Sequence, residues 1–276
     1  MDKVWFVTGA SSGFGRAITE AALADGDVVI GSARRAAALD DLARACPDQL
    51  EARELDVTDT GAAGAAVAEV LKRHGRIDVL VNNAGRTHVG AVEETTDDEL
   101  RALFDVHVFG PAALTRAVLP AMRERRSGAI VQMSSMGGQL SFAGFGAYSA
   151  TKFALEGLSE ALADEVREFG VRVLIVEPGA FRTGLFQGAS AGASVDGGNY
   201  PGVTGTRRMI AASDGAQPGD PAKAAALVLA ALAAPDAPLR LPLGDDAVSA
   251  VLAHADQVRT EVTAWADRTR ATALEE

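Results

Sequence analysis

The sequence contains little cysteine, histidine or aromatic side chain, and each shortage excludes a class of protein. Of 276 residues, one is cysteine and four are histidine, and aromatic residues make up 5%. The lone Cys46 cannot close an internal disulfide, so the sequence predicts a protein of the reducing cytoplasm. The histidines, at positions 74, 88, 107 and 254, do not have metal-ligand spacing, and we expect no metal site.

Positive charge and long apolar runs are also scarce. The chain has 26 Lys and Arg against 37 Asp and Glu, a net charge of −11, and its densest basic run is only 123–126. We therefore expect neither nucleic acid nor a membrane surface as a partner. The longest stretch of small apolar residues, 224–234, is shorter than the about 20 residues of a membrane span, and the N-terminus lacks the apolar region of a signal peptide.

What the chain does contain is an alternation of short Val- and Ile-rich runs with longer amphipathic segments. Such alternation is typical of repeated βαβ units, and the continuous hydrophobicity of the runs predicts parallel strands buried on both faces. The expected fold class is α/β, with helices on both faces of one sheet. The expected strands are Val4–Thr8, Val28–Ala33, Leu50–Glu54, Val79–Asn82, Ala129–Met133, Val171–Glu177 and Leu239–Leu241. The expected helices are Gly13–Asp25, Ala37–Ala45, Gly61–His74, Asp97–Arg126 with an interruption near Gly110, Tyr148–Glu168 and Pro221–Ala233.

Two segments depart from this alternation. Residues 183–219 are rich in Gly, Ser, Ala and Asn, and a connection this long is typical of a lid over a substrate; a disordered insert is the alternative. Residues 243–276 carry apolar side chains at helical spacing and predict a C-terminal helical extension. Because no linker or repeat separates these parts, we expect a single domain over 1–276.

The first strand runs directly into a glycine-rich turn and then into a helix. Glycines at positions 9, 13 and 15 let backbone N–H groups approach a phosphate, and the helix N-terminus adds the positive end of its dipole. A plain tight turn is the alternative, but the position between strand and helix favours a dinucleotide pyrophosphate site. The predicted contacts are Gly9, Ser11, Ser12, Gly13, Phe14 and Gly15.

The end of the second strand bears on the choice between NADP and NAD. A carboxylate there would hold the ribose 2′-OH of NAD, but the strand ends in Arg34 and Arg35. A guanidinium pairs with a 2′-phosphate, so these residues favour NADP(H) over NAD(H), unless both are merely solvated. After the third strand, Asp56 and Val57 are expected beside the adenine, with a solvated strand end as the alternative.

Tyr148 and Lys152 are four residues apart in a predicted helix and therefore share a face. A free tyrosine has a pKa of about 10, and an ammonium at about 4 Å with an effective dielectric of about 20 supplies about 4 kcal/mol, enough for acid and base chemistry at neutral pH. A surface pair is the alternative. Ser135 lies at the carboxyl end of the preceding strand, where its hydroxyl can orient a carbonyl. Without a Gly-x-Ser-x-Gly elbow there, a hydrolase is not expected.

These motifs resemble, in kind and order, those of the short-chain dehydrogenase/reductases. The resemblance implies a single-domain Rossmann fold, with seven parallel strands in the order 3-2-1-4-5-6-7, and an NADP-dependent oxidoreductase. It also implies Tyr148 as general acid and base, Ser135 as carbonyl orienter, and Lys152 as the cation that binds the nicotinamide ribose. The motifs that carry it, over residues 3–185, are Thr8–Gly15, Asn82-Asn83-Ala84-Gly85, Ser135, Tyr148-x-x-x-Lys152, and Pro178-Gly179 followed by Thr183.

The same resemblance places further residues. It implies that Asn83, Ala84 and Gly85 lie near the adenosine ribose, and that Pro178, Gly179 and Thr183 contact the nicotinamide carboxamide. At one position the chain departs from the family, which usually has an asparagine of a proton relay where this chain has His107. His107 either preserves that relay through its backbone carbonyl, joins it as a titrating group, or fills space.

The side chains expected around the substrate are mostly apolar and predict a small ketone, aldehyde or secondary alcohol, with core packing as the alternative for each. The extension past the last strand favours a general carbonyl reductase. A 3-oxoacyl-carrier-protein reductase, for which Arg207 and Arg208 supply a basic pair, and a non-catalytic NADP-sensing protein remain alternatives. Relatives of this kind are commonly dimers or tetramers, so a homodimer or homotetramer is expected. The predicted substrate contacts are Ser135, Met136, Phe142, Phe145, Phe181, Leu185 and Phe186, with Met209 from the lid.

Overall fold

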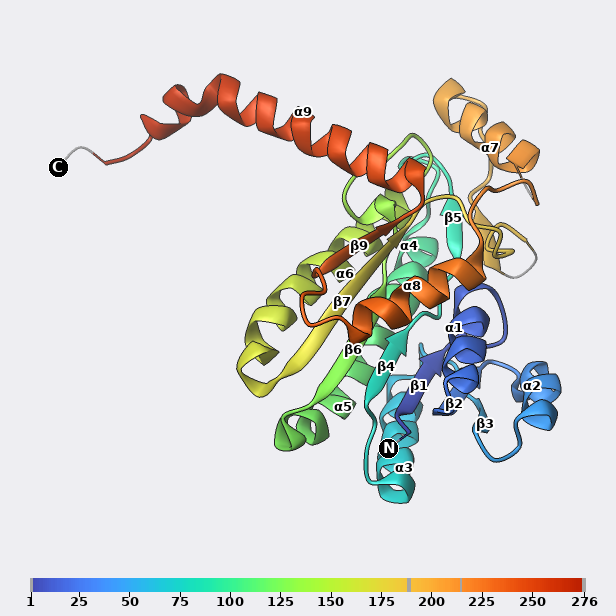
Figure 1. Ribbon diagram of the computed structural model, residues 1–276. Helices are drawn as coiled ribbons and strands as arrows, with labels where there is room; N and C mark the ends of the chain where they lie inside the picture. Colours follow the sequence, from blue (N-terminus) through green and yellow to red (C-terminus); the bar gives the residue numbers. More distant parts are fainter. Residues whose placement is uncertain (1, 188–189, 214, 275–276) are drawn as a thin grey trace.

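Seven parallel strands form the central sheet of the protein, whose computed structural model describes residues 2–187, 190–213 and 215–274 (Figure 1). The order is β3-β2-β1-β4-β6-β7-β9, and because β5 and β8 belong elsewhere, it is the predicted order 3-2-1-4-5-6-7. The register sets Phe6 beside Ile30 of β2 and Leu80 of β4. The strands are β1 Val4–Thr8, β2 Val28–Ala33, β3 Leu50–Glu54, β4 Val79–Asn82, β6 Gly128–Met133, β7 Val171–Pro178 and β9 Arg240–Leu243.

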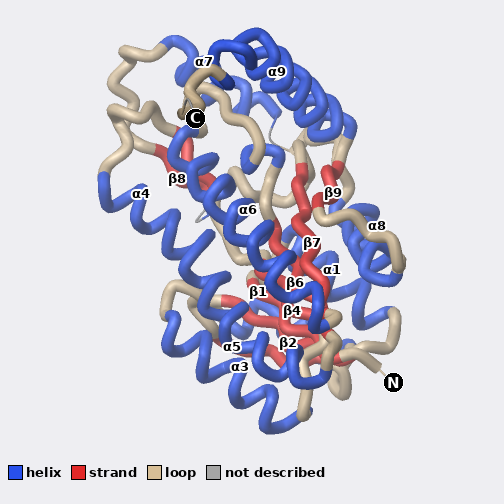
Figure 2. The backbone as a smooth tube through the Cα atoms, turned by 90° about the vertical axis from the view of Figure 1, so that its left-hand side faces the viewer, coloured by secondary structure: helices blue, strands red, loops and turns tan. Residues whose placement is uncertain are grey.

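Helices cover both faces of this sheet, as the predicted doubly wound fold requires (Figure 2). Side chains of β1 alternate between the faces: Trp5 and Val7 belong to one buried cluster, and Phe6 belongs to the other. The first cluster lies under α1 (Gly13–Ala24) and α8 (Pro221–Ala233). The second lies under α3 (Thr60–His74), α5 (Gly110–Arg125) and α6 (Gly146–Val166). Strands sandwiched in this way explain the continuous apolar runs of the sequence.

The long helical stretch expected from Asp97 is interrupted, one turn earlier than Gly110. It consists of α4 (Asp97–Phe104), a π-helical turn (Asp105–Phe109) and α5. A capping box between Thr96 and Glu99 starts α4. At Gly110 an added Cβ would lie 2.6 Å from the carbonyl oxygen of Val57, so only glycine lets the helix pass so close to that backbone.

Taken together with its π-helical turn, the helical stretch Asp97–Arg125 is by length and composition alone long and apolar enough to cross a membrane. Its side chains Leu114, Val118 and Met122 lie fully buried in the cluster between α5 and the sheet. The apolar face is therefore used inside the fold, as it is in a core helix.

Several elements were not expected from the sequence. The segment predicted as a lid loop, 183–219, contains β8 (Ala191–Ala193), which pairs in parallel with β5 (Thr87–Val89), and the helix α7 (Pro201–Ser213). The last strand begins at Arg240, whereas Leu239 was expected. The remaining short elements are the 3₁₀ turns at Ala36–Leu39, Met136–Gly138 and Arg167–Phe169, and α2 (Asp40–Ala45).

The chain closes with α9, a helix of 26 residues from Asp245 to Arg270. In Figure 1 only the N-terminal end of α9 lies against the sheet, beside β9, and the rest extends away from the body of the molecule. Of its side chains, only Ala247 is buried. The predicted C-terminal extension is thus a single protruding helix.

Candidate active site

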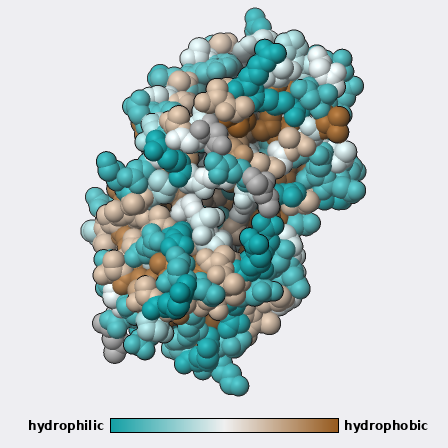
Figure 3. Space-filling view, turned by 90° about the vertical axis from the view of Figure 1, so that its right-hand side faces the viewer, coloured by the Kyte–Doolittle hydropathy of each residue, from teal (hydrophilic) through white to brown (hydrophobic). Residues whose placement is uncertain are grey.

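Two cavities lie side by side beyond the carboxyl ends of the strands, where parallel α/β sheets place their ligands. Their volumes are about 160 Å³ and about 310 Å³. Figure 3 shows the face of the molecule hollowed near its middle. Because both cavities have the same residues on their common border, they form one groove long enough to accept an extended ligand. The shared residues are Gly9, Ser12, Ala84, Gly85, Arg86 and Ser190.

The glycine turn forms one wall of this groove, and its geometry admits no side chains at the critical positions. Gly9 and Gly13 have φ angles of +65° and +54°, a region that favours glycine. At Gly15, an added Cβ would lie 2.3 Å from the carbonyl oxygen of Gly9, so α1 begins in direct contact with the turn. Ser12, at the N-cap of α1, makes no side-chain cap, and the helix N-terminus opens onto the groove. The turn therefore fits a phosphate-bearing cofactor.

Asn83 and Thr8 hold the glycine turn against the end of β4. The Asn83 side-chain amide donates to the carbonyl oxygen of Thr8 at 2.8 Å, and the hydroxyl of Thr8 accepts from the backbone N–H groups of Asn83 and Ala84 at 2.9 and 3.0 Å. Asn83 also lines the first cavity, as predicted, but its side chain is engaged with the turn. Its contribution to the groove is therefore to fix the shape of the turn.

The second cavity lies at the ends of β2 and β3. Arg34, Asp56 and Val57 line it, as the sequence predicts for the adenosine end of a dinucleotide. Asp56 accepts hydrogen bonds from the backbone N–H and the hydroxyl of Thr58, which lower the pKa of its carboxyl together with the nearby charge of Arg34. Arg34 is exposed and free to turn its guanidinium toward a ligand. Arg35, also predicted to contact the cofactor, precedes the 3₁₀ turn that follows and is not among the residues that line either cavity.

Tyr148, Lys152 and Ser135 meet in the first cavity. The first turns of α6 carry Tyr148 and Lys152, and Ser135 follows the end of β6. The hydroxyls of Ser135 and Tyr148 hydrogen-bond each other. The Lys152 ammonium donates to the carbonyl oxygen of Met133 at 2.9 Å and lies 5.6 Å from the centre of the Tyr148 ring. The predicted trio is therefore brought together, on one side of the glycine turn.

The expected acidification of Tyr148 by Lys152 is not found. Burial raises the pKa of Tyr148 to about 12, and the hydrogen bond from Ser135 only partly offsets that rise. Burial also lowers the pKa of Lys152 to about 8, since the ammonium loses its hydration. The expectation from the sequence included the electrostatic attraction between the Lys152 ammonium and the Tyr148 phenolate. It left out the free-energy cost of removing both charged groups from water. At neutral pH the phenol is protonated and can donate.

His107 lies in the π-helical turn beneath Tyr148 and is fully enclosed. Its Nε2 accepts from the backbone N–H of Arg86 at 3.2 Å, and its Nδ1 donates to the hydroxyl of Thr151 at 2.8 Å. Thr151 in turn donates to the backbone carbonyl of Tyr148 at 2.7 Å. Burial and the charge of Lys152 hold the pKa of His107 well below its usual value. A neutral imidazole with both nitrogens engaged therefore joins the segment between β4 and β5, the π-helical turn and α6.

Two acidic side chains that carry no motif lie behind Lys152. Glu156, one turn further along α6, and Glu177 of β7 lie close enough for each to shift the pKa of the other, and burial raises the pKa of both carboxyls, which favours a proton held between them. Arg240 of β9 lies 3.0 Å from Glu156 and 3.6 Å from Glu177. Burial raises the pKa of Glu177 to about 7. This cluster ties the helix that carries Tyr148 to β7 and to the edge strand β9.

The protonated pair makes stability depend on pH. Since the folded-state pKa of Glu177 lies above its unfolded value, the folded chain holds an extra proton, and the associated stability is lost as pH rises from about 4.5 through about 7. We expect Glu177→Gln to remove this loss. Between pH 5 and pH 8 the wild-type free energy of unfolding should fall by on the order of 2 kcal/mol more than that of the variant. Urea unfolding at both pH values measures the difference. Glu165→Gln, at an exposed position of α6, is the control, and parallel curves for wild type and Glu177→Gln would contradict the shared proton.

The apolar side chains predicted around the substrate divide into two groups. Phe181, Leu185 and Phe186 line the first cavity, with Phe186 packed edge-on against Phe145 at 6.4 Å. Phe145 itself packs against the Tyr148 ring at 6.0 Å, outside the set of cavity-lining residues. Among the described residues, those predicted to contact a ligand that do not line either cavity are Ser11, Gly15, Arg35, Met136, Phe142, Phe145 and Met209.

Some residues that line the groove were not predicted. Arg86 lines both cavities and directly follows the Asn-Asn-Ala-Gly motif, a position from which it could have been anticipated. Ser190 and Gln217 come from the lid segment, whose path no sequence pattern reveals. The further unpredicted lining residues are Met133, Ser134, Ala180, Gly184, Ala33, Thr58, Ala102, Asp105 and Val106.

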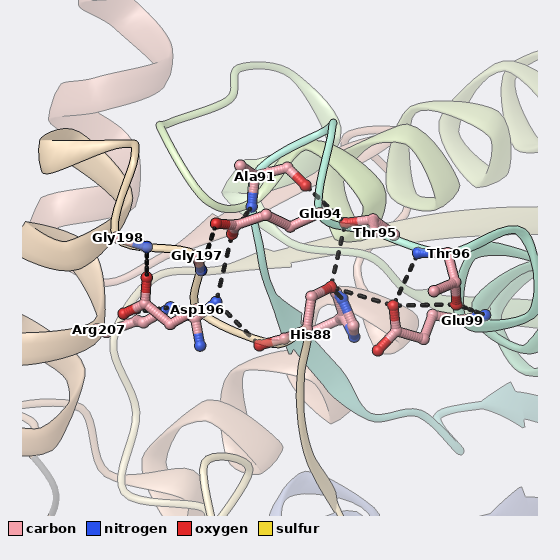
Figure 4. Close-up of polar contacts among 11 residues, drawn as sticks. His88, Ala91, Glu94, Thr95, Thr96, Glu99, Asp196, Gly197, Gly198 and Arg207 are labelled. Atoms are coloured by element: carbon pink, nitrogen blue, oxygen red, sulfur yellow. Dashed lines mark hydrogen bonds and ion pairs between the residues drawn. The ribbon is translucent and has the colours of Figure 1, made fainter.

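The lid is fastened to the segment between β5 and α4 by a polar network (Figure 4). Ser194, directly after β8, accepts from His88 at 2.8 Å and donates to Glu99 at 3.1 Å. Arg207 of α7 donates to the carbonyl oxygen of Ser194 at 3.0 Å, and the backbone N–H of Gly197 donates to Glu94 at 2.9 Å. Ser194 and His88 are buried, and Glu99 contacts the serine and not the imidazole, so the pair is not a hydrolytic nucleophile and base. These described parts of the lid are ordered by their contacts.

Comparison with known proteins agrees with this geometry. Residues 3–193 match the short chain dehydrogenase family. The sequence is 36% identical to oxidoreductase BOA17 of Botryotinia fuckeliana, over 99% of this chain and 100% of that protein. The fold is similar to that of a short-chain dehydrogenase from Streptomyces avermitilis, with 61% identity and a TM-score of 0.93 over 99% of this chain and 98% of that one.

A metagenomic short-chain oxidoreductase solved in complex with NADP is 37% identical, with a TM-score of 0.62 over 65% of this chain and 83% of that chain. The family match covers most of the chain, and the relative from Botryotinia fuckeliana is similar over its whole length. The chain therefore belongs to the short-chain dehydrogenase/reductase family of oxidoreductases.

Proposed function

We propose that the protein is an NADP(H)-dependent oxidoreductase that transfers a hydride between the nicotinamide and a ketone, aldehyde or secondary alcohol. The observation that carries the proposal is the meeting of Tyr148, Ser135 and Lys152 in a cavity that continues into the glycine turn. A proton donor, an orienting hydroxyl and a cation on one side of a dinucleotide groove are the groups that carbonyl reduction needs.

Each of these side chains has a distinct task. The phenol of Tyr148 is protonated at neutral pH, the more so because burial raises its pKa, and it donates its proton to the carbonyl oxygen of the substrate. The Ser135 hydroxyl, already bonded to that phenol, holds the same oxygen in place. Lys152, fixed by the Met133 carbonyl, keeps positive charge next to the phenol and can bind ribose hydroxyls. NADPH, when bound in this groove, would supply the hydride.

Binding of NADP(H) in preference to NAD(H) is supported by the residues at the end of β2. Arg34 lines the second cavity, and no described carboxylate other than Asp56 and Asp105 lines it. A relative that shares 37% identity was solved with NADP. The glycine turn would hold the pyrophosphate, Asp56 and Val57 the adenine edge, and Pro178, Gly179 and Thr183 the carboxamide.

An apolar carbonyl or alcohol is the substrate class that we propose, because Phe181, Leu185 and Phe186 line the cavity beside Tyr148. A 3-oxoacyl-carrier-protein substrate is less well supported, since Arg207 of the basic lid pair already contacts Ser194, Glu94 and Asp196. A non-catalytic NADP sensor would not need the complete set of Tyr148, Ser135 and Lys152. The half-buried free thiol of Cys46 suits the reducing cytoplasm that we propose as the location.

A panel of carbonyl compounds tests the proposed reaction. The purified protein should oxidise NADPH with apolar ketones or aldehydes and reduce NADP with the corresponding alcohols, and NADH should support lower rates. Absorbance at the nicotinamide band measures turnover. Firm NADPH binding without turnover on any carbonyl would favour the sensor, and turnover restricted to carrier-linked thioesters would favour the acyl-carrier reductase.

A further inference from the structure

The exposed face of α9 carries a regular apolar stripe. From Val248 to Trp265, six apolar positions follow one another in steps of three and four residues, the spacing of a coiled-coil seam, and Leu252 adds an exposed apolar side chain beside them. The stripe runs over about 25 Å of helix. Val262 is 64% exposed and Trp265 is 58% exposed. The seam residues, a set that we call the α9 seam, are Val248, Val251, Ala255, Val258, Val262 and Trp265.

The described part of the chain leaves most of the α9 seam open: Val251 is partly exposed, and Arg268 of the same helix lies over the Trp265 ring, 4.8 Å from its centre. Only Ala247 of α9 is buried, and every described residue after Val251 is exposed except His254 and Ala266, which are partly exposed. In Figure 1 this part of α9 stands clear of the body. An isolated helix with an apolar stripe is only marginally stable in water, so its length and pattern call for a covering surface.

The α9 seam is complementary to itself in one antiparallel register. When two copies of α9 run in opposite directions about a two-fold axis between residues 256 and 257, the large Trp265 meets the smaller Val248, and the central alanine meets a valine. Pairing a large side chain of one helix with a small side chain of the other fills the space between the helices evenly. The facing pairs are Val248 with Trp265, Val251 with Val262, and Ala255 with Val258.

The charges that flank the seam fit the same register. Asp245 and Asp246 occupy the first turn of α9, and Arg268 and Arg270 occupy the last. In an antiparallel pair the acidic end of one helix therefore lies beside the basic end of the other. At the middle of the seam, the same register sets His254 beside Glu261 of the second copy.

We propose that α9 is a self-association arm, which pairs antiparallel with α9 of a second copy of this chain. An anionic membrane surface is a poorer fit, because α9 carries five acidic and three basic residues. The pairing is independent of the catalytic assignment, since no seam residue lines the groove.

Sedimentation of the full chain tests the pairing. The wild type should sediment with twice the mass of one chain, and Val258→Glu/Val262→Glu should raise the dissociation constant by at least about 100-fold, because two unpaired carboxylates would be buried. Thr260→Glu/Ala264→Glu is the matched control. It places the same charges with the same spacing on the outer face of α9 and should remain dimeric. NADPH binding by all three proteins verifies that the body is folded.

Cross-linking tests the direction of the helices. In a Cys46→Ser background, Val251→Cys and Val262→Cys proteins should form a disulfide when mixed, and each should cross-link poorly alone. Disulfides that form in the Val251→Cys protein alone and in the Val262→Cys protein alone, but not between the two proteins, would show a parallel pair and overturn the antiparallel register. A wild-type protein that is monomeric at about 100 µM, where a micromolar contact is saturated, would overturn the proposal itself. So would a seam variant that dimerises as well as the control.

Discussion

Tyr148→Phe is expected to lower the rate of carbonyl reduction by about 10²- to 10⁴-fold, the usual range for a removed general acid. The change deletes one oxygen and leaves the ring packed edge-on between His107 and Phe145. The Tyr148 hydroxyl hydrogen-bonds Ser135, so the variant leaves that hydroxyl one partner short without disturbing the backbone of α6. Steady-state kinetics should show the loss in kcat, and fluorescence titration should show nearly unchanged NADPH affinity.

The chain supplies a matched control for this variant, since its only other tyrosine is Tyr200 in the lid. Tyr200 hydrogen-bonds Glu93 at the surface and does not line the groove. Tyr200→Phe makes the same chemical change and should keep wild-type turnover. If Tyr148→Phe kept a substantial part of the activity, another group would donate the proton, and the assignment of Tyr148 would be wrong.

The elements that follow from local pattern were predicted well. Gly9, Gly13 and Gly15 form the turn that their spacing predicted, because only glycine tolerates the backbone angles and close contacts found there. Tyr148 and Lys152 share a helix face because helical geometry alone places residues four apart together. The seven expected segments became seven parallel strands, and inner strands such as β1 and β4 are buried along their whole length, which leaves a continuous apolar signal in sequence. The edge strand β3 is only partly apolar, and Leu50 is its one buried residue.

The features that the sequence analysis predicted wrongly or missed depend on tertiary contacts, which leave no local signal in the sequence. The pKa of Tyr148 is set mainly by burial, and the depth at which a side chain is buried cannot be read from a spacing of four residues. Glu156 and Glu177 are 21 residues apart in different elements and meet only once the sheet and α6 have packed. The strand β8 is Ala-Gly-Ala, a sequence without strand propensity, and it forms because Thr87–Val89 offers a free edge.

The proposed preference for NADP(H) rests on Arg34, a residue that the sequence singled out and that the structure leaves exposed. Arg34 lines the cavity at the ends of β2 and β3, close enough to Asp56 to lower the pKa of that carboxyl. Asp56 is itself occupied by Thr58, so the Arg34 guanidinium has donors to spare for a phosphate. A 2′-phosphate bound there gains charge-assisted hydrogen bonds that the 2′-hydroxyl of NADH cannot match.

Arg34→Asp should therefore weaken NADPH binding by about 100-fold or more, because hydrogen bonds to a charged group contribute about 1.5–3 kcal/mol and the new carboxylate repels the phosphate. NADH affinity should change little or improve, since a carboxylate can accept from the 2′-hydroxyl. Dissociation constants for both cofactors, measured at one ionic strength, give the ratio. Arg35→Asp is the control, because it makes the identical change of charge one residue away, outside the cavity. It distinguishes the loss of a direct contact between Arg34 and the phosphate from a general change in the electrostatic potential around the cavity. Equal losses in the two variants, or an unaltered NADPH to NADH ratio in Arg34→Asp, would place the 2′-phosphate away from Arg34.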